Sequence, residues 1–249
     1  MEPDDRGVFS LVNANGAGPV VIVCEHASPF MPASYANLGL TGEALTSHVA
    51  WDPGANLVAE RLSTLFDAPY VRGEVSRLIY DCNRPPEAES AMPARSELFD
   101  IPGNVGLDQT ERDRRTHIVY EPFKACDEQE MGAAGSDAAL VTIHSFVPVY
   151  HGKPRAVELG ILHDADSRLA DAMLEAAPRH TTMNTLRNEP YGPEDGVTHT
   201  LKLHGLSIGV PNVMIEIRND LVASPQACEQ VAGMLHGLIS EALAEIQSA

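Results

Sequence analysis

The segment Val20–His26, with the sequence VVIVCEH, decides the fold because an uninterrupted apolar run ends directly in a carboxylate and an imidazole. Such a run, rich in β-branched residues, is typical of a strand that is buried on both faces of a parallel sheet. Comparable runs lie at Ala139–Ile143 (ALVTI), Val157–Leu162 (VELGIL) and Val213–Ile217 (VMIEI). The sequence therefore predicts a buried strand at each of these four places.

Helical patterns alternate with these strands. Asp52-Pro53 suits the start of a helix, because Asp is a good N-cap and Pro fits the first helical position. Helices are predicted over residues 52–66, 108–131, 164–177, 200–208 and from Ser224-Pro225 onward, with a short one near 42–50 and extended chain over 70–75 and 78–82. This alternation predicts a three-layer α/β fold with a mixed, mostly parallel sheet and helices on both faces.

The length of 249 residues fits one large α/β domain, and no linker or repeat divides the chain. We therefore predict a single domain over residues 1–249, in which residues 1–18 form a loose polar arm. Residues 85–107 are rich in Pro, Gly, Glu and Ser and are predicted to form a long surface loop. Long loops in compact domains are often functional.

The charge and the cysteines limit the possible partners and location. A net charge of −18 argues against nucleic acid and anionic membranes, which are both polyanionic. No apolar run approaches the ~20 residues of a membrane span, and the acidic N-terminus lacks a signal-peptide core. The four cysteines are widely spaced and are expected to be buried, reduced thiols. We expect a cytoplasmic protein that binds an anionic small molecule in a local pocket of Arg or metal.

The ends of the predicted strands carry metal-ligand side chains. Ligands of open α/β sheets bind beyond the carboxyl ends of the strands, where His26 and His144 are expected. Two imidazoles at one sheet edge are natural Zn²⁺ ligands, and a catalytic zinc needs a third protein ligand. Candidates for that ligand are Asp52, Glu25 and His163. We favour Asp52, although helix capping would explain it equally well.

Glu216 interrupts the apolar pattern of its predicted strand. It lies between Ile215 and Ile217, and a carboxylate buried on a strand is costly unless it is paired. An ion pair with Arg218 is one explanation. The functional explanation is a general base, whose pKa partial burial raises toward neutrality so that it takes a proton from the attacking water of a zinc hydrolase.

Arginines supply the expected anion site. Asn83-Arg84 follows the extended segment 78–82, and the planar guanidinium of Arg binds carboxylates in bidentate fashion. Arg84 is the predicted anchor for an acidic substrate, assisted by Arg77 and Arg218, although surface salt bridges would account for any of them.

Two further polar residues are substrate-binding candidates. Tyr191 lies in the predicted turn NEPYG, residues 188–192, which could present its hydroxyl to the pocket. His204 could reach a substrate carbonyl, although an ordinary histidine on a helix surface is an equally good explanation.

Five motifs together resemble the N-formylglutamate amidohydrolase family over roughly residues 20–222. They are CEHAS at 24–28, SRLIYDCNRP at 76–85, IHSF at 143–146, NEPYG at 188–192 and IEIRNDL at 215–221. The resemblance implies a phosphorylase/hydrolase-like α/β fold related to zinc carboxypeptidases. It also implies hydrolysis of an N-formyl or similar N-acyl amide of an acidic amino acid.

The wider carboxypeptidase-like pattern implies roles for matching positions. His26 and His144 resemble its zinc-binding histidines, Asn83-Arg84 its carboxylate-binding pair, and Glu216 its catalytic glutamate. The pattern has a Glu ligand three residues after the first His, but here Pro29 occupies that position. The third ligand must then come from elsewhere in the chain.

Three hypotheses follow. The first is a Zn²⁺-dependent amidohydrolase that converts N-formyl-L-glutamate and water to L-glutamate and formate, as in histidine degradation. The second is a hydrolase of another N-acyl amino acid or a short peptide. The third is a non-catalytic protein that binds an acidic metabolite without metal. A thiol hydrolase built on Cys24 is weaker, because Cys24 lies inside an apolar strand and has no assigned histidine.

Overall fold

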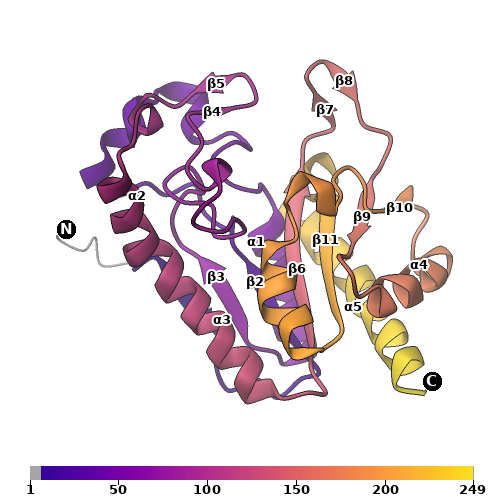
Figure 1. Cartoon of the computed structure of the whole chain (residues 1–249). Coiled ribbons are helices and arrows are strands. Elements are labelled where there is room, and N and C mark those ends of the chain that lie inside the picture. The colour runs from indigo at the N-terminus through magenta and orange to yellow at the C-terminus, as the bar shows by residue number, and fades with distance from the viewer. Residues whose placement is uncertain (1–6, 249) are drawn as a thin grey trace.

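A seven-stranded mixed sheet forms the centre of the molecule in the computed structural model, which describes residues 7–248 (Figure 1). The strand order is β1-β3-β2-β6-β11-β9-β10, and the four central strands β3, β2, β6 and β11 are parallel. β1 and β9 run antiparallel to their neighbours β3 and β11. The strands are β1 Phe9–Val12, β2 Val20–Cys24, β3 Tyr70–Gly73, β6 Ala139–Phe146, β9 Leu159–Leu162, β10 Thr185–Arg187 and β11 Asn212–Arg218.

Helices cover both faces of this sheet, which confirms the predicted three-layer α/β architecture. The helices are α1 Ala55–Phe66, α2 Gln109–Arg115, α3 Glu121–Ala134, α4 Arg168–His180 and α5 Pro225–Ser248. α1, α4 and α5 pack on one face, and α3 packs on the other together with the π-helical turn Leu201–Gly205. Figure 1 shows α3 in front of the sheet and α5 behind it. None of the helices within residues 7–248 is long and apolar enough to span a membrane.

The register of β11 against β6 places functional side chains side by side. Glu216 pairs directly with His144 on the neighbouring parallel strand. Val213, Ile215 and Ile217 face the core beneath α1 and α5, whereas Met214 packs into the opposite core. Successive side chains of this strand therefore face opposite sides of the sheet.

Several local predictions are wrong. Residues 9–12 were expected within a loose arm but form β1 at the sheet edge, and residues 1–6 lie outside the described part. The segment 78–82 forms buried turns instead of a strand. β10 lies in a stretch where no strand is predicted, and the predicted helix near 42–50 is only the 3₁₀ turn Gly42–Leu45.

Two short hairpins rise above the carboxyl edge of the sheet. They consist of β4 Arg95–Ser96 with β5 Phe99–Asp100, and β7 Val149–Tyr150 with β8 Lys153–Pro154. The first lies within the predicted long loop 85–107. The second follows β6 directly, so both hairpins stand beside the strand ends.

Candidate active site

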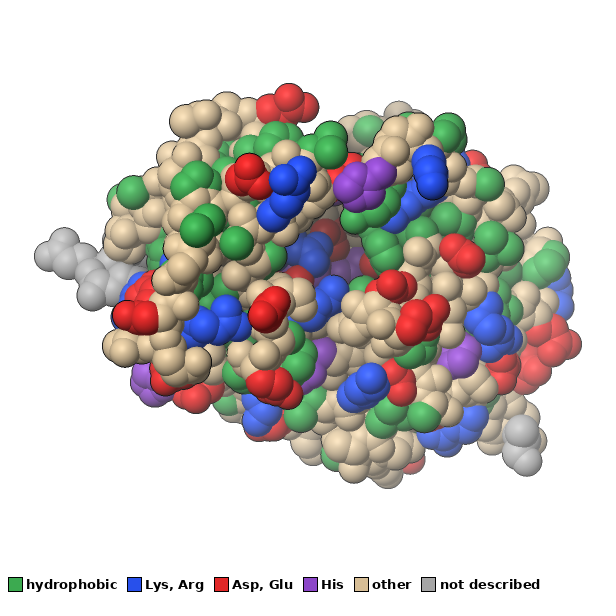
Figure 2. Space-filling model, turned by 45° about the horizontal axis from the view of Figure 1, so that its top comes forward, with side chains coloured by type: hydrophobic (Ala, Val, Ile, Leu, Met, Phe, Trp, Pro, Cys, Tyr) green, Lys and Arg blue, Asp and Glu red, His purple; other side chains and the backbone are tan. Residues whose placement is uncertain are grey.

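A cleft of about 310 Å³ opens at the carboxyl ends of β2, β6 and β11. The two hairpins and residues 191–197 form its rim, and the turns 77–84 form one side. Figure 2 shows the hollow from outside, with basic, acidic and histidine side chains gathered in it. The cleft therefore lies where a parallel sheet is expected to bind its ligand.

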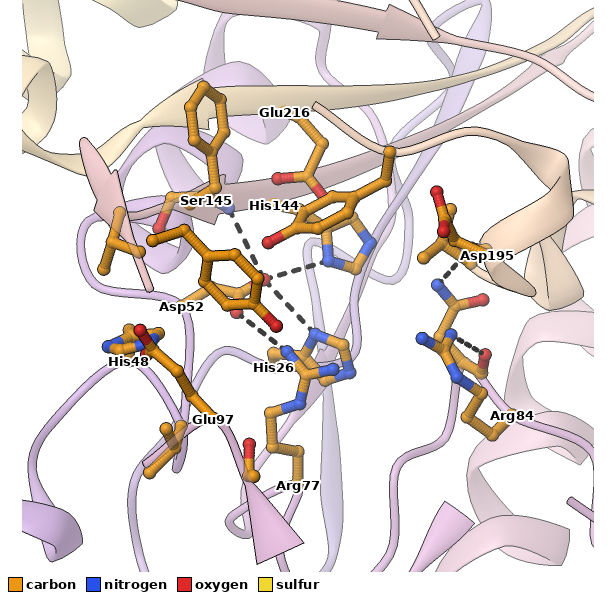
Figure 3. A pocket seen from close by; sticks show the side chains of 18 residues that line it. His26, His48, Asp52, Arg77, Arg84, Glu97, His144, Ser145, Asp195 and Glu216 are labelled. Atoms are coloured by element: carbon orange, nitrogen blue, oxygen red, sulfur yellow. Dashed lines mark hydrogen bonds and ion pairs between the residues drawn. The ribbon is translucent and has the colours of Figure 1, made fainter. Parts of the chain in front are cut away.

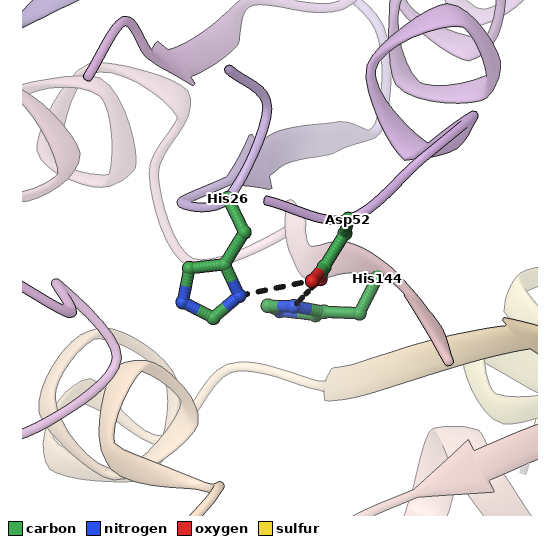
Figure 4. Close-up of side chains that lie close together, drawn as sticks. All are labelled: His26, Asp52 and His144. Carbon is green, nitrogen blue, oxygen red and sulfur yellow. Dashed lines mark hydrogen bonds and ion pairs between the residues drawn. The ribbon is translucent and has the colours of Figure 1, made fainter. Parts of the chain in front are cut away.

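Three predicted metal ligands meet at the floor of this cleft (Figure 4). Asp52 Oδ2 lies 3.2 Å from His26 Nδ1 and 2.9 Å from His144 Nδ1. One ligand atom from each of the three residues lies within 4.8 Å of the other two, and all three residues are buried. Both imidazoles and the carboxylate thus point at one small region.

The local backbone leaves the Asp52 carboxylate free for this region. α1 begins only at Ala55, and its N-cap is Gly54 with a φ of 85°, so the predicted capping role of Asp52 is wrong. The Asp52 backbone N–H donates to the His26 carbonyl over 2.9 Å, which ties the two loops together. The side chain then faces the histidines.

A second carboxylate stands behind each histidine. His26 Nε2 lies 2.7 Å from Asp81 Oδ1, and His144 Nε2 lies 3.1 Å from Glu25 Oε2. Thr200 donates a short hydrogen bond from its hydroxyl to Glu25 Oε1. Such outer carboxylates orient metal-binding imidazoles and fix which ring nitrogen carries the proton.

The donor set fits a divalent metal on this geometry. With protons on the Nε2 atoms, the Nδ1 atoms of His26 and His144 and the Oδ2 atom of Asp52 present electron pairs to a common point. Burial lowers the pKa of both histidines, but the neighbouring carboxylates outweigh it and the pKa of each is raised. The region between the three side chains therefore favours a positive charge. Two imidazoles and one carboxylate also match the ligands of a catalytic zinc site that keeps one position open.

Glu216 lies at the same cleft from the end of β11 (Figure 3). Its Oε2 atom is buried and has no hydrogen-bond partner among residues 7–248. Burial raises the pKa of this carboxyl to about 7, against the opposing effect of His144. The ion pair with Arg218 that would have explained its burial is absent, so Glu216 can exchange a proton near neutral pH.

Two arginines of the cleft have different surroundings. Arg77 donates to Asp81 Oδ2 over 2.6 Å and to Asp52 Oδ1 over 3.3 Å, so it supports the carboxylates of the cluster. Arg84 has no carboxylate partner within the described chain and donates only to the Asn83 carbonyl, over 2.8 Å. It lies across the cleft from His48 and Glu97 (Figure 3). Arg84 is thus the cation available to an anionic ligand.

Asn83 lines the cleft, but its side chain is occupied by backbone groups. Its amide donates to the Val197 carbonyl over 2.5 Å and accepts from the Thr200 N–H over 3.1 Å. It therefore holds segment 197–200 against the turn that carries Arg84. Tyr191, in contrast, lines the cleft as expected.

The structure does not bring three candidates to the cleft. Arg218 pairs with Glu158 and Asp220 at the end of β11. His204 is buried against α3, where its Nε2 atom lies 3.8 Å from an oxygen of Asp127. His163 lies beside β10, where its Nε2 atom is 2.9 Å from Arg187 Nη1.

Sequence reasoning overlooked residues whose roles depend on contacts between distant segments. Asp81 is part of the SRLIYDCNRP motif, yet nothing in the sequence indicates that it contacts His26. His48 and Glu97, 2.6 Å apart, converge on the rim from separate loops. Arg155 follows the second hairpin and contacts Tyr191. Only the folded chain reveals these pairs.

Comparisons with known proteins identify the family and the fold. The family model described as N-formylglutamate amidohydrolase matches residues 18–223. The crystal structure of gene product Atu2144 from Agrobacterium tumefaciens is 54% identical, with a TM-score of 0.94 over 97% of this chain and 96% of that one. N-formylglutamate amidohydrolase from Ralstonia eutropha JMP134 is 18% identical and has a similar fold, with a TM-score of 0.69 over 97% and 99% of the two chains. No curated protein matches significantly. From the family match, the chain belongs to the N-formylglutamate amidohydrolase family.

Proposed function

We propose that this chain is a metal-dependent amidohydrolase that converts N-formyl-L-glutamate and water to L-glutamate and formate. One observation carries the proposal. The convergent donors of His26, Asp52 and His144 share a cleft with Glu216, a buried carboxylate that has an unpartnered oxygen. Family membership supports the same reaction.

His26, Asp52 and His144 would hold the metal, and Zn²⁺ suits their nitrogen and oxygen donors. A bound zinc would polarise the substrate carbonyl and lower the pKa of water. Asp81 and Glu25 would keep the two imidazoles oriented, with Nδ1 directed at the metal.

The remaining residues would act on substrate and protons. Arg84, without a carboxylate partner, would bind a substrate carboxylate. Glu216 would accept a proton from the attacking water and donate it to the leaving amine as the C–N bond breaks. A pKa of about 7 suits both the uptake and the release of this proton near neutral pH. The products suggest a cytoplasmic role in amino-acid catabolism such as histidine degradation.

A formate-release assay tests the proposal. The purified protein is given N-formyl-L-glutamate, N-formyl-L-aspartate or N-acetyl-L-glutamate, before and after chelation and after zinc is restored. We expect fastest release from N-formyl-L-glutamate, loss on chelation and recovery with zinc. Faster cleavage of another N-acyl amino acid would keep the chemistry but change the substrate. A metal-free protein that binds these compounds and cleaves none would be a binding protein instead.

A thiol mechanism is disfavoured. Burial, together with Asp52 and Glu25, raises the pKa of Cys24 well above its usual range. The reactive thiolate would therefore be scarce at neutral pH. All four cysteines are buried and free of disulfides.

A further inference from the structure

Arg155 stands behind three aromatic side chains that line the cleft. Its guanidinium carbon lies 5.4 Å from the ring centroid of Phe146, 4.5 Å from that of Tyr150 and 4.8 Å from that of Tyr191. No carboxylate in residues 7–248 pairs with it. A half-buried guanidinium without an acid is stabilised here by ring faces, which hold its plane in one orientation.

Arg155 also determines the orientation of the Tyr191 hydroxyl. Its Nη2 atom donates a hydrogen bond of 2.9 Å to the Tyr191 oxygen. Because the guanidinium has only donors, Tyr191 must direct its own O–H away from Arg155. That O–H donates to no residue in the described chain, and the charges of Glu216 and Arg77 both act on the hydroxyl. It is an unused donor in the cleft.

We propose that Arg155 is a positioning residue, which holds Tyr191 so that the tyrosine O–H donates to the carbonyl oxygen of the scissile amide as that oxygen gains negative charge. The proposal rests on the amidohydrolase function proposed above. Removing one oriented donor at such an oxygen typically lowers kcat roughly 10²- to 10³-fold.

Tyr191 would act by hydrogen bonding and would keep its proton. Burial and Glu216 raise the pKa of its hydroxyl to about 12, while Arg155 opposes them. The hydroxyl therefore stays protonated at neutral pH. Its role differs from that of Glu216, which would transfer a proton.

A double-mutant cycle tests the coupling between the two residues. Arg155→Met and Tyr191→Phe are each expected to lower kcat roughly 10²-fold with KM changed less than about threefold, at the lower end of the range for one lost donor. The double variant should be no more than about threefold slower than Tyr191→Phe alone, because Arg155 acts through the hydroxyl. Arg155→Lys should recover part of the loss. Arg179→Met, an exposed arginine paired with Glu241, is the matched control and should leave kcat unchanged.

A spectroscopic measurement tests the positioning without any turnover. Tyrosine is labelled with ¹³C at Cζ, and the Tyr191 signal is identified by its loss in Tyr191→Phe. In Arg155→Met this signal should shift and broaden, and the signal of Tyr150, whose ring Arg155 also contacts, should shift as well. The signals of the other four tyrosines should keep their positions.

The two results separate the possible failures. An unchanged Tyr191 signal, or rate losses that multiply in the double variant, would overturn the positioning role. If the wild-type chain cleaves no N-acyl amino acid but the Tyr191 signal responds, the proposed function fails while the contact stands. In that case the predicted catalytic effect fails with it.

Discussion

Asp52 and Glu216 are buried carboxylates in one cleft, yet their pKa values move in opposite directions. Burial would raise the pKa of Asp52, but His26, His144 and Arg77 outweigh it and lower the pKa. Burial and the charge of Asp52 raise the pKa of Glu216 more than the neighbouring cations lower it, and its Oε2 atom accepts no hydrogen bond in the described chain. A permanently charged carboxylate suits a metal ligand, and a neutral-range carboxyl suits a general base.

Glu216→Gln tests the second role. The amide keeps the shape of the side chain but cannot accept a proton, so kcat should fall roughly 10²- to 10⁴-fold with zinc content unchanged. Formate release and metal analysis measure the two quantities. Glu245→Gln, on the exposed side of α5, is the control. Near-normal turnover of Glu216→Gln would rule out the general base.

A substitution of Glu25 tests whether the carboxylate behind His144 strengthens zinc binding. Burial raises its pKa, but His144 and Thr200 outweigh this effect and lower it to about 2, so the residue is ionised behind the imidazole. Glu25→Gln should weaken zinc binding roughly 10- to 100-fold, as measured by competition with a chelating dye. Thr200→Val should have a smaller effect of the same sign. Equal affinity in Glu25→Gln and the wild type would mean that the imidazole needs no such partner.

At the scale of elements, caps with local partners were predictable and turns with distant partners were not. Asp108, at the start of the helix predicted over 108–131, accepts from the Glu111 N–H over 2.9 Å, and Ser224 accepts from the Ala227 N–H at the start of α5. The segment 78–82, by contrast, is apolar enough for a strand. Its backbone forms turns instead: the Ile79 N–H donates to the Ser76 carbonyl and the Asp81 N–H to the distant Ala91 carbonyl.

Helix α3 carries an acid that should couple stability to pH. Asp127 is buried, its Oδ1 atom has no hydrogen-bond partner in the described chain, and burial raises its pKa well above the usual value. The folded state thus keeps a proton that the unfolded chain loses above about pH 4. Stability from this group is complete below that pH and is lost as pH rises toward the folded-state pKa.

Asp127→Asn should remove this dependence. Urea unfolding at pH 5 and pH 8 measures the effect. The stability of the variant relative to wild type should rise between the two pH values, because only the wild type has a carboxyl to ionise on unfolding. Contributions of titratable groups distant from Asp127 occur in both proteins and cancel in the comparison. A difference that is the same at both pH values would contradict the prediction.

At the scale of the whole molecule, the cluster of His26, Asp52 and His144 joins the loop after β2, the turn before α1 and the end of β6. A metal bound there would stabilise the folded chain, because the unfolded chain does not assemble the site. Zinc at 100 times its Kd should add about 2.7 kcal/mol to the free energy of unfolding. For a protein of this size that corresponds to a Tm increase of roughly 5–10 °C.

Thermal unfolding with and without zinc measures this shift. Asp52→Ala should abolish most of it, since the variant lacks one of three donors. Magnesium at the same concentration is the control, because it prefers oxygen ligands and should bind weakly to two imidazoles. Equal shifts with both metals, or in Asp52→Ala, would mean that the ion binds elsewhere.

The sequence by itself determined the α/β class, the buried strands and the strand-end positions of His26, His144 and Glu216. These features follow from local periodicity and from the rule that parallel strands deliver their ends to one edge. Only the tertiary structure shows that Asp52, and neither Glu25 nor His163, shares a three-residue cluster with His26 and His144, and that Arg218 and His204 lie away from the cleft. The physical reason is that a side chain's role depends on partners tens of residues away, whose convergence no local pattern encodes.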